Sequence, residues 1–201
     1  MTADISPAAP VIAPDQITGV VLCGGAGRRM GGVQKPLIEL DGRTLLDRVL
    51  ERVRPQVARI VISANEELPR YAAYGYEVIR DATPGLGPLG GLAACARVVT
   101  TPWIFVCAGD APYLDSYLIS RLALVRGPHD AGALPHDGER AHYLMLLVRT
   151  ETCASIAPYL TAGHRSVRGW LSTLPVREVA LPALRESFRN LNTPDDLQAT
   201  E

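Results

Sequence analysis

The chain has 201 residues, of which 47% are hydrophobic and 20% charged, which is enough apolar material for a globular core and too much for a disordered protein. Its 20 basic and 21 acidic residues give a formal net charge of -1, so charge provides no general attraction to nucleic acid or to an anionic membrane. No apolar run is long enough to span a bilayer, and residues 1–14 lack the basic start and apolar segment of a signal peptide. We therefore expect a cytoplasmic protein, with residues 1–14 as a mobile tail and with neither nucleic acid nor membrane as a partner.

Residues 15–201 alternate short apolar segments with segments of helical periodicity. In chain order, this pattern predicts a strand at 17–23, a helix at 44–53, strands at 59–64 and 77–79, a helix at 87–99, a strand at 103–107, a helix at 115–125, strands at 131–134 and 143–148, and helices at 151–160 and 166–171. Asp115 is expected to cap its helix, and Asn192, followed by Thr193 and Pro194, to begin a final one. Such alternation is typical of a single three-layer α/β/α domain, Rossmann-like, with a mostly parallel sheet.

The four cysteines are far apart in the sequence, and no two of them form a C-x-x-C pair. They are Cys23, Cys95, Cys107 and Cys153. This spacing favours reduced thiols in the core over a disulfide framework.

Polar or glycine-rich segments follow four of the predicted strands. Residues 24–32 follow the first strand, Asn65 the second, Asp81 the third and Asp110 the fourth. Because ligands bind beyond the carboxyl ends of the strands in open parallel sheets, we expect these four segments to share one edge of the sheet.

The segment after the first strand has the composition of an anion-binding loop. Glycines at positions 24, 25, 27, 31 and 32 allow backbone N–H groups to approach an anion closely. Arg28, Arg29 and Lys35, the only lysine of the chain, add three cations, which suits a polyphosphate. The alternative is a flexible turn with solvated arginines.

Two common phosphate-binding motifs do not fit this loop. A Walker A motif needs glycine before its lysine and Ser or Thr after it, whereas Lys35 lies between Gln34 and Pro36. A dinucleotide fingerprint needs a third glycine where Met30 stands, and an acidic residue after the second strand, where Asn65 stands.

The loop does match the nucleotidyltransferase signature Gly-Gly-x-x-x-Arg-Met-Gly-x-x-x-Lys, which runs from Gly24 to Lys35. Further segments resemble the molybdenum cofactor guanylyltransferase (MobA) family. They are ITGVVL at 17–22, RRMGGV at 28–33, Leu40-x-Gly42, GPLGG at 87–91, HDGER at 136–140 and NLNTPDDL at 190–197. The resemblance implies a fold of the nucleotide-diphospho-sugar transferase type and transfer of GMP from GTP to the terminal phosphate of molybdopterin, carrying molybdenum, with release of pyrophosphate.

The same resemblance implies roles for individual residues. Lys35 would neutralise the α-phosphate or the leaving pyrophosphate, and Asp110 would ligate Mg2+. Arg29 would bind the β- and γ-phosphates, with Arg28 as a second candidate for that role. The nucleotide would also contact Leu22, Cys23, Gly24, Gly25, Asn65 and Asp81. Asp110 could instead cap a helix, and Asn65 and Asp81 could simply begin loops.

The acceptor would be bound by the C-terminal half of residues 15–201 and the nucleotide by the N-terminal half. Arg165 and Arg168 are candidates for its phosphate, and Asn192 for its orientation, although each also suits a solvated face or a helix cap. The sequence departs from the family pattern at three points. Cys23 replaces a common alanine, Gly109 stands where a cysteine usually precedes the aspartate, and Tyr143 follows His142 in place of proline.

Two other functions remain open from the sequence. The first is the same chemistry with CTP or with a sugar 1-phosphate acceptor, although relatives that use CTP tend to begin with Thr-Ala-Ala-Gly rather than with the Leu-Cys-Gly-Gly of residues 22–25. The second is a carrier of nucleotide or cofactor without catalysis, which the presence of both Lys35 and Asp110 disfavours. Proteins that insert molybdenum or deliver the cofactor are expected partners of the enzyme.

Overall fold

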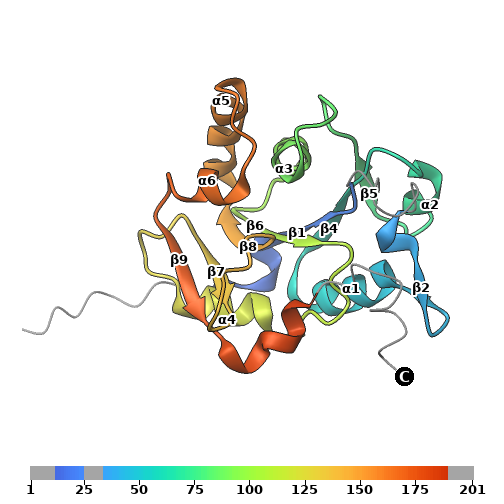
Figure 1. Ribbon diagram of the computed structural model, residues 1–201, viewed down its shortest axis with the longest axis horizontal. Coiled ribbons are helices and arrows are strands. Elements are labelled where there is room, and N and C mark those ends of the chain that lie inside the picture. Colours follow the sequence, from blue (N-terminus) through green and yellow to red (C-terminus); the bar gives the residue numbers. More distant parts are fainter. Residues whose placement is uncertain (1–11, 25–33, 190–201) are drawn as a thin grey trace, which may run out of the picture.

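The computed structural model describes residues 12–24 and 34–189, and a seven-stranded sheet forms its centre (Figure 1). The strands are β1 (Ile17–Leu22), β4 (Arg59–Ser63), β5 (Glu77–Ile79), β6 (Trp103–Ala108), β7 (Gly132–His136), β8 (Met145–Arg149) and β9 (Val176–Ala180). Their order across the sheet is β5-β4-β1-β6-β8-β7-β9, and only β8 runs antiparallel to its neighbours. The predicted mostly parallel sheet is confirmed.

Helices cover both faces of this sheet, with α3, α5 and α6 above it and α1 and α4 below it in the view of Figure 1. The α-helices are α1 (Leu45–Val53), α2 (Leu68–Ala72), α3 (Pro88–Ala96), α4 (Leu118–Val125), α5 (Ile156–Thr161) and α6 (Val167–Leu171). Shorter 3-10 segments are η1 (Pro14–Gln16), η3 (Lys35–Leu37), η4 (Arg54–Gln56), η5 (Thr150–Ser155) and η6 (Pro182–Phe188). A separate hairpin joins β2 (Glu39–Leu40) to β3 (Arg43–Thr44).

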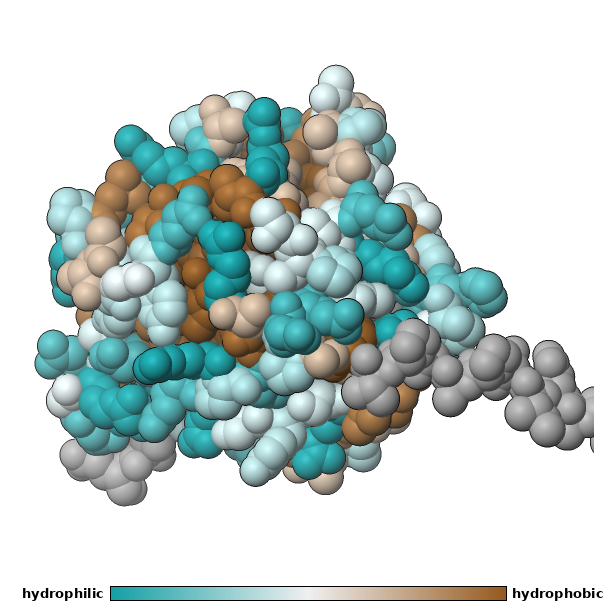
Figure 2. Space-filling model, turned by 180° about the vertical axis from the view of Figure 1, so that it is seen from behind, coloured by the Kyte–Doolittle hydropathy of each residue, from teal (hydrophilic) through white to brown (hydrophobic). Residues whose placement is uncertain are grey.

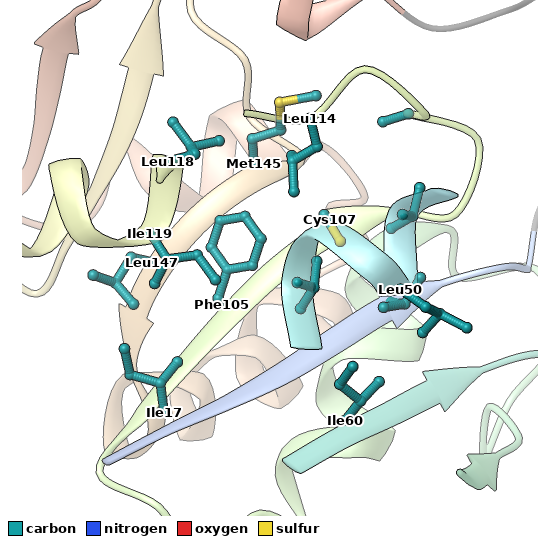
Figure 3. Close-up of a cluster of buried hydrophobic side chains, with 14 of the residues drawn as sticks. Ile17, Leu50, Ile60, Phe105, Cys107, Leu114, Leu118, Ile119, Met145 and Leu147 are labelled. Atoms are coloured by element: carbon teal, nitrogen blue, oxygen red, sulfur yellow. The ribbon is translucent and has the colours of Figure 1, made fainter. Parts of the chain in front are cut away.

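Alternation of side chains along each buried strand divides the core into two parts, one on each face of the sheet. In β1, Ile17 and Val21 belong to the part between the sheet and helices α1 and α4. Val20 and Leu22 belong to the part between the sheet and helices α3, α5 and α6. Figure 3 shows the first part, in which Phe105 of β6 lies among side chains from the neighbouring strands and from α4. The three-layer arrangement predicted from the sequence is therefore present.

In open α/β sheets the ligand crevice lies where the connections diverge to either side of one strand, and here that strand is β1. From β1 the chain reaches β4, on one side of β1, by way of α1 beneath the sheet. From β5 it returns to β6, on the other side of β1, by way of α3 above the sheet. Strand order thus reverses between β1 and β6, and the carboxyl ends of these two strands are where such folds bind ligands.

The structure corrects several details of the predicted elements. The helix expected at 115–125 begins at Leu118, because Asp115 accepts the backbone N–H of Tyr117 (2.9 Å) in a turn ahead of it and no side chain caps the helix. The segment expected as one helix at 151–160 starts as 3-10 turns in η5 and becomes α-helical only in α5. Strand β9 was not predicted, since its burial is confined to Val179 and its sequence, VREVA, is largely polar. The helix expected after Asn192 lies outside the described residues.

Across residues 12–24 and 34–189, no helix is both long and apolar enough to cross a membrane. Viewed from behind, the surface is mainly hydrophilic, with hydrophobic atoms showing between the hydrophilic groups (Figure 2). Such a mixture is normal for a folded protein and by itself marks no interface.

Candidate functional site

The carboxyl ends of β1, β4 and β6 are joined by backbone hydrogen bonds just where the crevice begins. The N–H of Gly109 donates to the carbonyl of Leu22 (2.9 Å), and the N–H of Cys23 donates to the carbonyl of Ser63 (2.8 Å). These bonds extend the parallel ladder by one residue beyond β1 and β6. As a result, Cys23 lies beside Gly109, the residue that precedes Asp110.

Lys35 enters the same region from a short and well-anchored 3-10 turn. In η3, the N–H of Leu37 donates to Gln34 and that of Ile38 to Lys35, and Pro36 and Leu37 are buried. The amide Nε2 of Gln34, itself 9% exposed, donates to Oε2 of Glu66 at 2.7 Å. The turn that carries Lys35 is thereby tied to the loop that follows β4.

Lys35 and Asp110 interact electrostatically across the crevice. Burial raises the pKa of the Asp110 carboxyl above its ordinary value, because the charged form loses water, and the charge of Lys35 counteracts part of that rise. A half-buried carboxylate beside an ammonium group is the arrangement expected where a polyphosphate and its cation bind together.

Asn65 and Asp81 form a second cluster at the same edge. Asn65 Nδ2 donates to Asp81 Oδ2 (3.0 Å), and the backbone N–H of Asp81 donates to Asn65 Oδ1 (2.9 Å). A Cβ at Gly24 would lie 3.4 Å from Asn65 Nδ2, so this pair adjoins the start of the glycine loop. The other oxygen of Asp81, Oδ1, is buried and accepts no hydrogen bond from the described residues, so it can serve as an acceptor for a ligand N–H.

The structure therefore brings one group of the predicted residues to a single edge of the sheet. That group consists of Leu22, Cys23, Gly24, Lys35, Asn65, Asp81 and Asp110. Three more predicted residues, Gly25, Arg29 and Asn192, lie outside the described residues, as does Arg28.

The two arginines predicted for the acceptor lie elsewhere, on the face that carries α5 and α6. Arg165 Nη1 donates to the carbonyls of Leu160 (2.7 Å) and His164 (2.6 Å), so its guanidinium satisfies the C-terminal end of α5. Arg168 is exposed on α6. These contacts give Arg165 a structural role, and the acceptor roles of both residues stay predictions.

A polar hollow of about 400 Å³ beside Ala108, the last residue of β6, was not foreseen as such from the sequence. Arg140, His142, Phe188 and Arg189 are among the residues that line it. The ring of His142 lies 4.5 Å from that of Phe188, centroid to centroid. The motif at 136–140 was the one signal that pointed to this place, and it named Arg140 without indicating a hollow.

Asp137 organises the loop that borders this hollow. Its Oδ1 accepts the backbone N–H groups of Arg140 and Glu139 (2.8 Å each), and its Oδ2 lies 2.7 Å from His142 Nε2. The two backbone donors, with His142, hold the pKa of Asp137 well below its usual range. Asp137 is thus a fixed anion that orients His142 rather than a proton donor.

A more apolar cavity of about 530 Å³ lies between α3 and the η5–α5 segment. Alanines of both segments and Leu86, Cys153 and Leu160 are among its lining residues, and its surface is mostly apolar. It borders the loop after Asp81 but does not include the Lys35–Asp110 crevice, and its lining does not suit a polyphosphate.

The donor set of the crevice fits the hard cation of a nucleotide complex rather than a site built from protein ligands alone. No three His, Cys, Asp or Glu side chains gather as a metal site in the described parts of the chain. Mg2+ prefers oxygen ligands and commonly takes only one or two carboxylates, with phosphate oxygens and water completing its shell. Asp110 matches that requirement.

Comparison with known proteins places these features in context. Residues 19–179 match the family model described as the MobA-like NTP transferase domain. The chain is 37% identical over 183 residues to a molybdenum cofactor guanylyltransferase of Serratia proteamaculans, covering 90% of this chain and 92% of that protein. A relative of the same name from Polynucleobacter asymbioticus is 34% identical over 197 residues, covering 95% and 98%. Among solved structures, the molybdopterin-guanine dinucleotide biosynthesis protein A of Archaeoglobus fulgidus is similar with a TM-score of 0.75 and 26% identity, covering 90% of this chain and 95% of that one.

Proposed function

The chain belongs to the MobA-like NTP transferase family, and we propose that it transfers GMP from GTP to the terminal phosphate of molybdopterin, forming the guanine dinucleotide cofactor and pyrophosphate. The observation that carries the proposal is the meeting of Lys35 and Asp110 at the carboxyl ends of β1 and β6, beside the start of the glycine loop. The names of the relatives specify the nucleotide and the cofactor.

The reaction joins two anions, so positioning and charge neutralisation supply most of the catalysis. A phosphate oxygen of the acceptor attacks the α-phosphorus of GTP, and the bond from that phosphorus to the bridging oxygen of the β-phosphate breaks. Lys35 is placed to offset the charge that accumulates on the α-phosphate and on the departing pyrophosphate. Arg29, outside the described residues, is proposed to bind the β- and γ-phosphates.

Asp110 is the residue proposed to hold a divalent cation, Mg2+ in our proposal. When bound, such an ion would supply positive charge that offsets the negative charge of the phosphates and makes the α-phosphorus more electrophilic. The pKa of Asp110 is raised because its charged form loses water on burial, and a bound cation would offset that cost.

Asp81 and Asn65 are proposed to recognise the guanine. Guanine offers the N1–H and the 2-amino group as donors, and the buried Asp81 Oδ1 is an acceptor that no described residue of the chain uses. Asn65 holds Asp81 at two points, because its Nδ2 donates to Oδ2 of the carboxylate and its Oδ1 accepts the backbone N–H of Asp81, and this orients Oδ1 of Asp81 before the nucleotide arrives. Cytosine has no N–H at the corresponding ring position, so this arrangement favours GTP over CTP.

The acceptor is proposed to bind in the C-terminal half of the chain, in the hollow beside Ala108. Arg140 and Arg189 offer cations there, and His142 and Phe188 offer ring surface for a flat heterocycle. Arg165 and Arg168 do not line this hollow, and Asn192 lies outside the described residues, so the acceptor roles of these three residues stay predictions from the sequence. A cytoplasmic location, and contacts with proteins that insert molybdenum or deliver the cofactor, stay predictions from the sequence.

The test is to incubate the purified protein with GTP, Mg2+ and molybdopterin, and to measure pyrophosphate together with the guanine dinucleotide. We expect both products in equal amounts, and neither product when Mg2+ is chelated. Parallel assays replace GTP by CTP, and molybdopterin by a sugar 1-phosphate. Faster turnover with either replacement would reject the assignment, and binding of GTP and molybdopterin without pyrophosphate release would favour a carrier.

A further inference from the structure

Gly109 is the meeting point of three segments that each carry a residue of the proposed site. A Cβ built on Gly109 would lie 2.7 Å from Cys23 Sγ, 3.1 Å from Pro36 Cγ and 3.2 Å from Pro36 Cβ. Cys23 precedes Gly24, Pro36 follows Lys35, and Gly109 itself precedes Asp110. Every contact at this point is therefore one residue away from a group expected to touch the nucleotide or its cation.

The reason for glycine at this position is space and not backbone conformation. The φ angle of Gly109 does not lie in the positive region, so an L-residue could adopt the same backbone angles without strain. A carbon atom 2.7 Å from sulfur is closer than van der Waals contact allows, and Cys23 and Pro36 are both buried, which leaves little freedom to yield.

The side chain of Cys23 fills the space that a side chain at position 109 would occupy. Its side chain is 3% exposed, and burial raises the pKa of the thiol well above its ordinary value, so the sulfur stays protonated at neutral pH and is a poor nucleophile. Its sulfur occupies the space directly above the Cα of Gly109. The residue thus acts through its size.

We propose that Gly109 and Cys23 are a pair of positioning residues that set the distance between the turn carrying Lys35 and the loop carrying Asp110. The empty position at Gly109 lets Pro36 reach the backbone ahead of Asp110, and the sulfur of Cys23 fills the remaining space so that the contact has one fitted geometry. This inference deepens the proposed function and rests on it for its catalytic consequence. Its structural consequence can be read without any activity.

The experiment is a double-mutant cycle with Gly109→Ala, Cys23→Ala and the combination of both. Gly109→Ala adds one methyl group against Cys23 and Pro36, and the combined variant removes the sulfur that the methyl group meets. We expect Gly109→Ala to lower kcat/KM for GTP by about 30-fold and to raise the Mg2+ concentration for half-maximal rate, because small misplacement of reacting groups is costly. Cys23→Ala leaves a gap and is expected to lose about threefold, and the double variant to regain about tenfold over Gly109→Ala.

Gly19→Ala is the matched control. A Cβ at Gly19, in the core part of β1, would lie 2.8 Å from Val53 Cγ1, so the substitution produces a comparable clash at a distance from the crevice. It is expected to lower the melting temperature and to leave the Mg2+ dependence unchanged. An equal change of Mg2+ dependence in Gly19→Ala would reduce the effect at Gly109 to general destabilisation and overturn the proposal.

Crystal structures of the ligand-free wild type and variants give a second readout that needs no catalysis. We expect the distance between the Cα atoms of Lys35 and Asp110 to increase by about 0.5 Å or more in Gly109→Ala, because overpacked sites relax by backbone shifts. The distance is expected to return to the wild-type value in the double variant.

If Gly109→Ala does not fold, Cys23→Val adds bulk to the same contact from the other side and is expected to show the same displacement. An unchanged separation, or losses in the cycle that simply add, would overturn the inference. An inactive wild type would instead reject the proposed function while leaving this structural arm decisive.

Discussion

At the scale of single residues, the proposed site sets a buried carboxylate beside a cation. The pKa of Asp110 is raised because the carboxyl is buried, and the charge of Lys35 moderates the rise. Removing Lys35 would therefore take away a charge that stabilises the buried carboxylate.

Lys35→Ala and Asp110→Asn are each expected to lower the turnover number by at least about 100-fold, since each removes charge stabilisation in the transition state. Initial rates of pyrophosphate release at saturating GTP and Mg2+ measure this. Asp115→Asn is the matched control for the carboxylate, because Asp115 lies five residues further on and serves only the turn before α4 and Arg121. A turnover number within threefold of wild type in Asp110→Asn would contradict the assignment.

Asp81→Asn is expected to raise the KM for GTP by about 10- to 100-fold while changing kcat less, because it replaces part of a buried acceptor by a donor that opposes the guanine N–H groups. Inosine triphosphate, which lacks the 2-amino group, sharpens the test: the preference for GTP over inosine triphosphate should shrink in the variant. Glu77→Gln, at the exposed ion pair with Arg59 on β5, is the control. A preference that stays the same in Asp81→Asn would remove Asp81 from base recognition.

Gly109 and Cys23 are sterically linked at this scale. A side chain at position 109 would collide with the sulfur of Cys23, so glycine at one position accommodates cysteine at the other. The space beside the loop that carries Asp110 is thus filled from the end of the neighbouring strand, β1.

At the scale of elements, α1 is the helix whose local signals are most complete. Thr44 Oγ1 accepts the N–H of Asp47 (3.0 Å), and Asp47 Oδ2 accepts the N–H of Thr44 (3.0 Å), which is a reciprocal cap. Leu46, Val49 and Val53 then recur at helical spacing and bury one face against the sheet. The cap also fixes where the chain leaves the β2–β3 hairpin, just after the turn that carries Lys35.

Thr44→Ala is expected to lower the free energy of unfolding by about 1 kcal/mol, because it removes the acceptor that satisfies the first turn of α1. Urea unfolding followed by circular dichroism measures the change. Thr44→Ser keeps the hydroxyl group and is expected to retain most of the stability. An equal loss in both variants would show that the γ-methyl group of Thr44, and not its hydroxyl, supplies the stabilisation.

At the scale of the whole molecule, all four cysteines are buried and free. Burial raises the pKa of Cys95, Cys107 and Cys153 to about 12, against an ordinary value of 9.0, because the thiolate cannot be solvated in the core. Between pH 9 and pH 12 these thiols lose their protons in the unfolded chain but keep them in the folded chain. The contribution of the neutral thiols to the free energy of unfolding is therefore complete below pH 9 and is lost progressively as the pH rises toward 12.

The free energy of unfolding is expected to fall by about 1 kcal/mol for each buried thiol between pH 8 and pH 10. Chemical denaturation in a series of buffers at constant ionic strength gives the slope. Cys153 lies in η5, away from the crevice. In Cys153→Ala, the free energy of unfolding is expected to fall less over this pH interval, because one buried thiol is missing. A stability that is flat or rises over this interval would contradict the burial of neutral thiols.

The sequence was sufficient wherever the signal was local and periodic. The alternation of apolar strands with a helix such as α1 predicted the layers and the mostly parallel sheet, and the polar segments after four strands predicted one edge for Asn65, Asp81 and Asp110. It was insufficient for β9, which is polar and held by pairing with β7, and for the start of the helix after Asp115, where a turn competes with the cap. The hollow beside Ala108 was also missed, because residues from β6, the 140–145 segment and Phe188 meet only in the folded chain.

Periodicity, glycine spacing and residue chemistry are properties of neighbouring positions, and they alone determined the fold class, the anion-binding character of residues 24–35 and the family resemblance. Other features involve residues far apart in the chain: the contact of Gly109 with Cys23 and Pro36, and the hydrogen bond between Gln34 and Glu66. The burial of Asp81 Oδ1, which accepts no hydrogen bond from the described residues, also depends on distant segments. Those were decided by the tertiary structure, because steric fit and desolvation arise only when separate segments pack against one another.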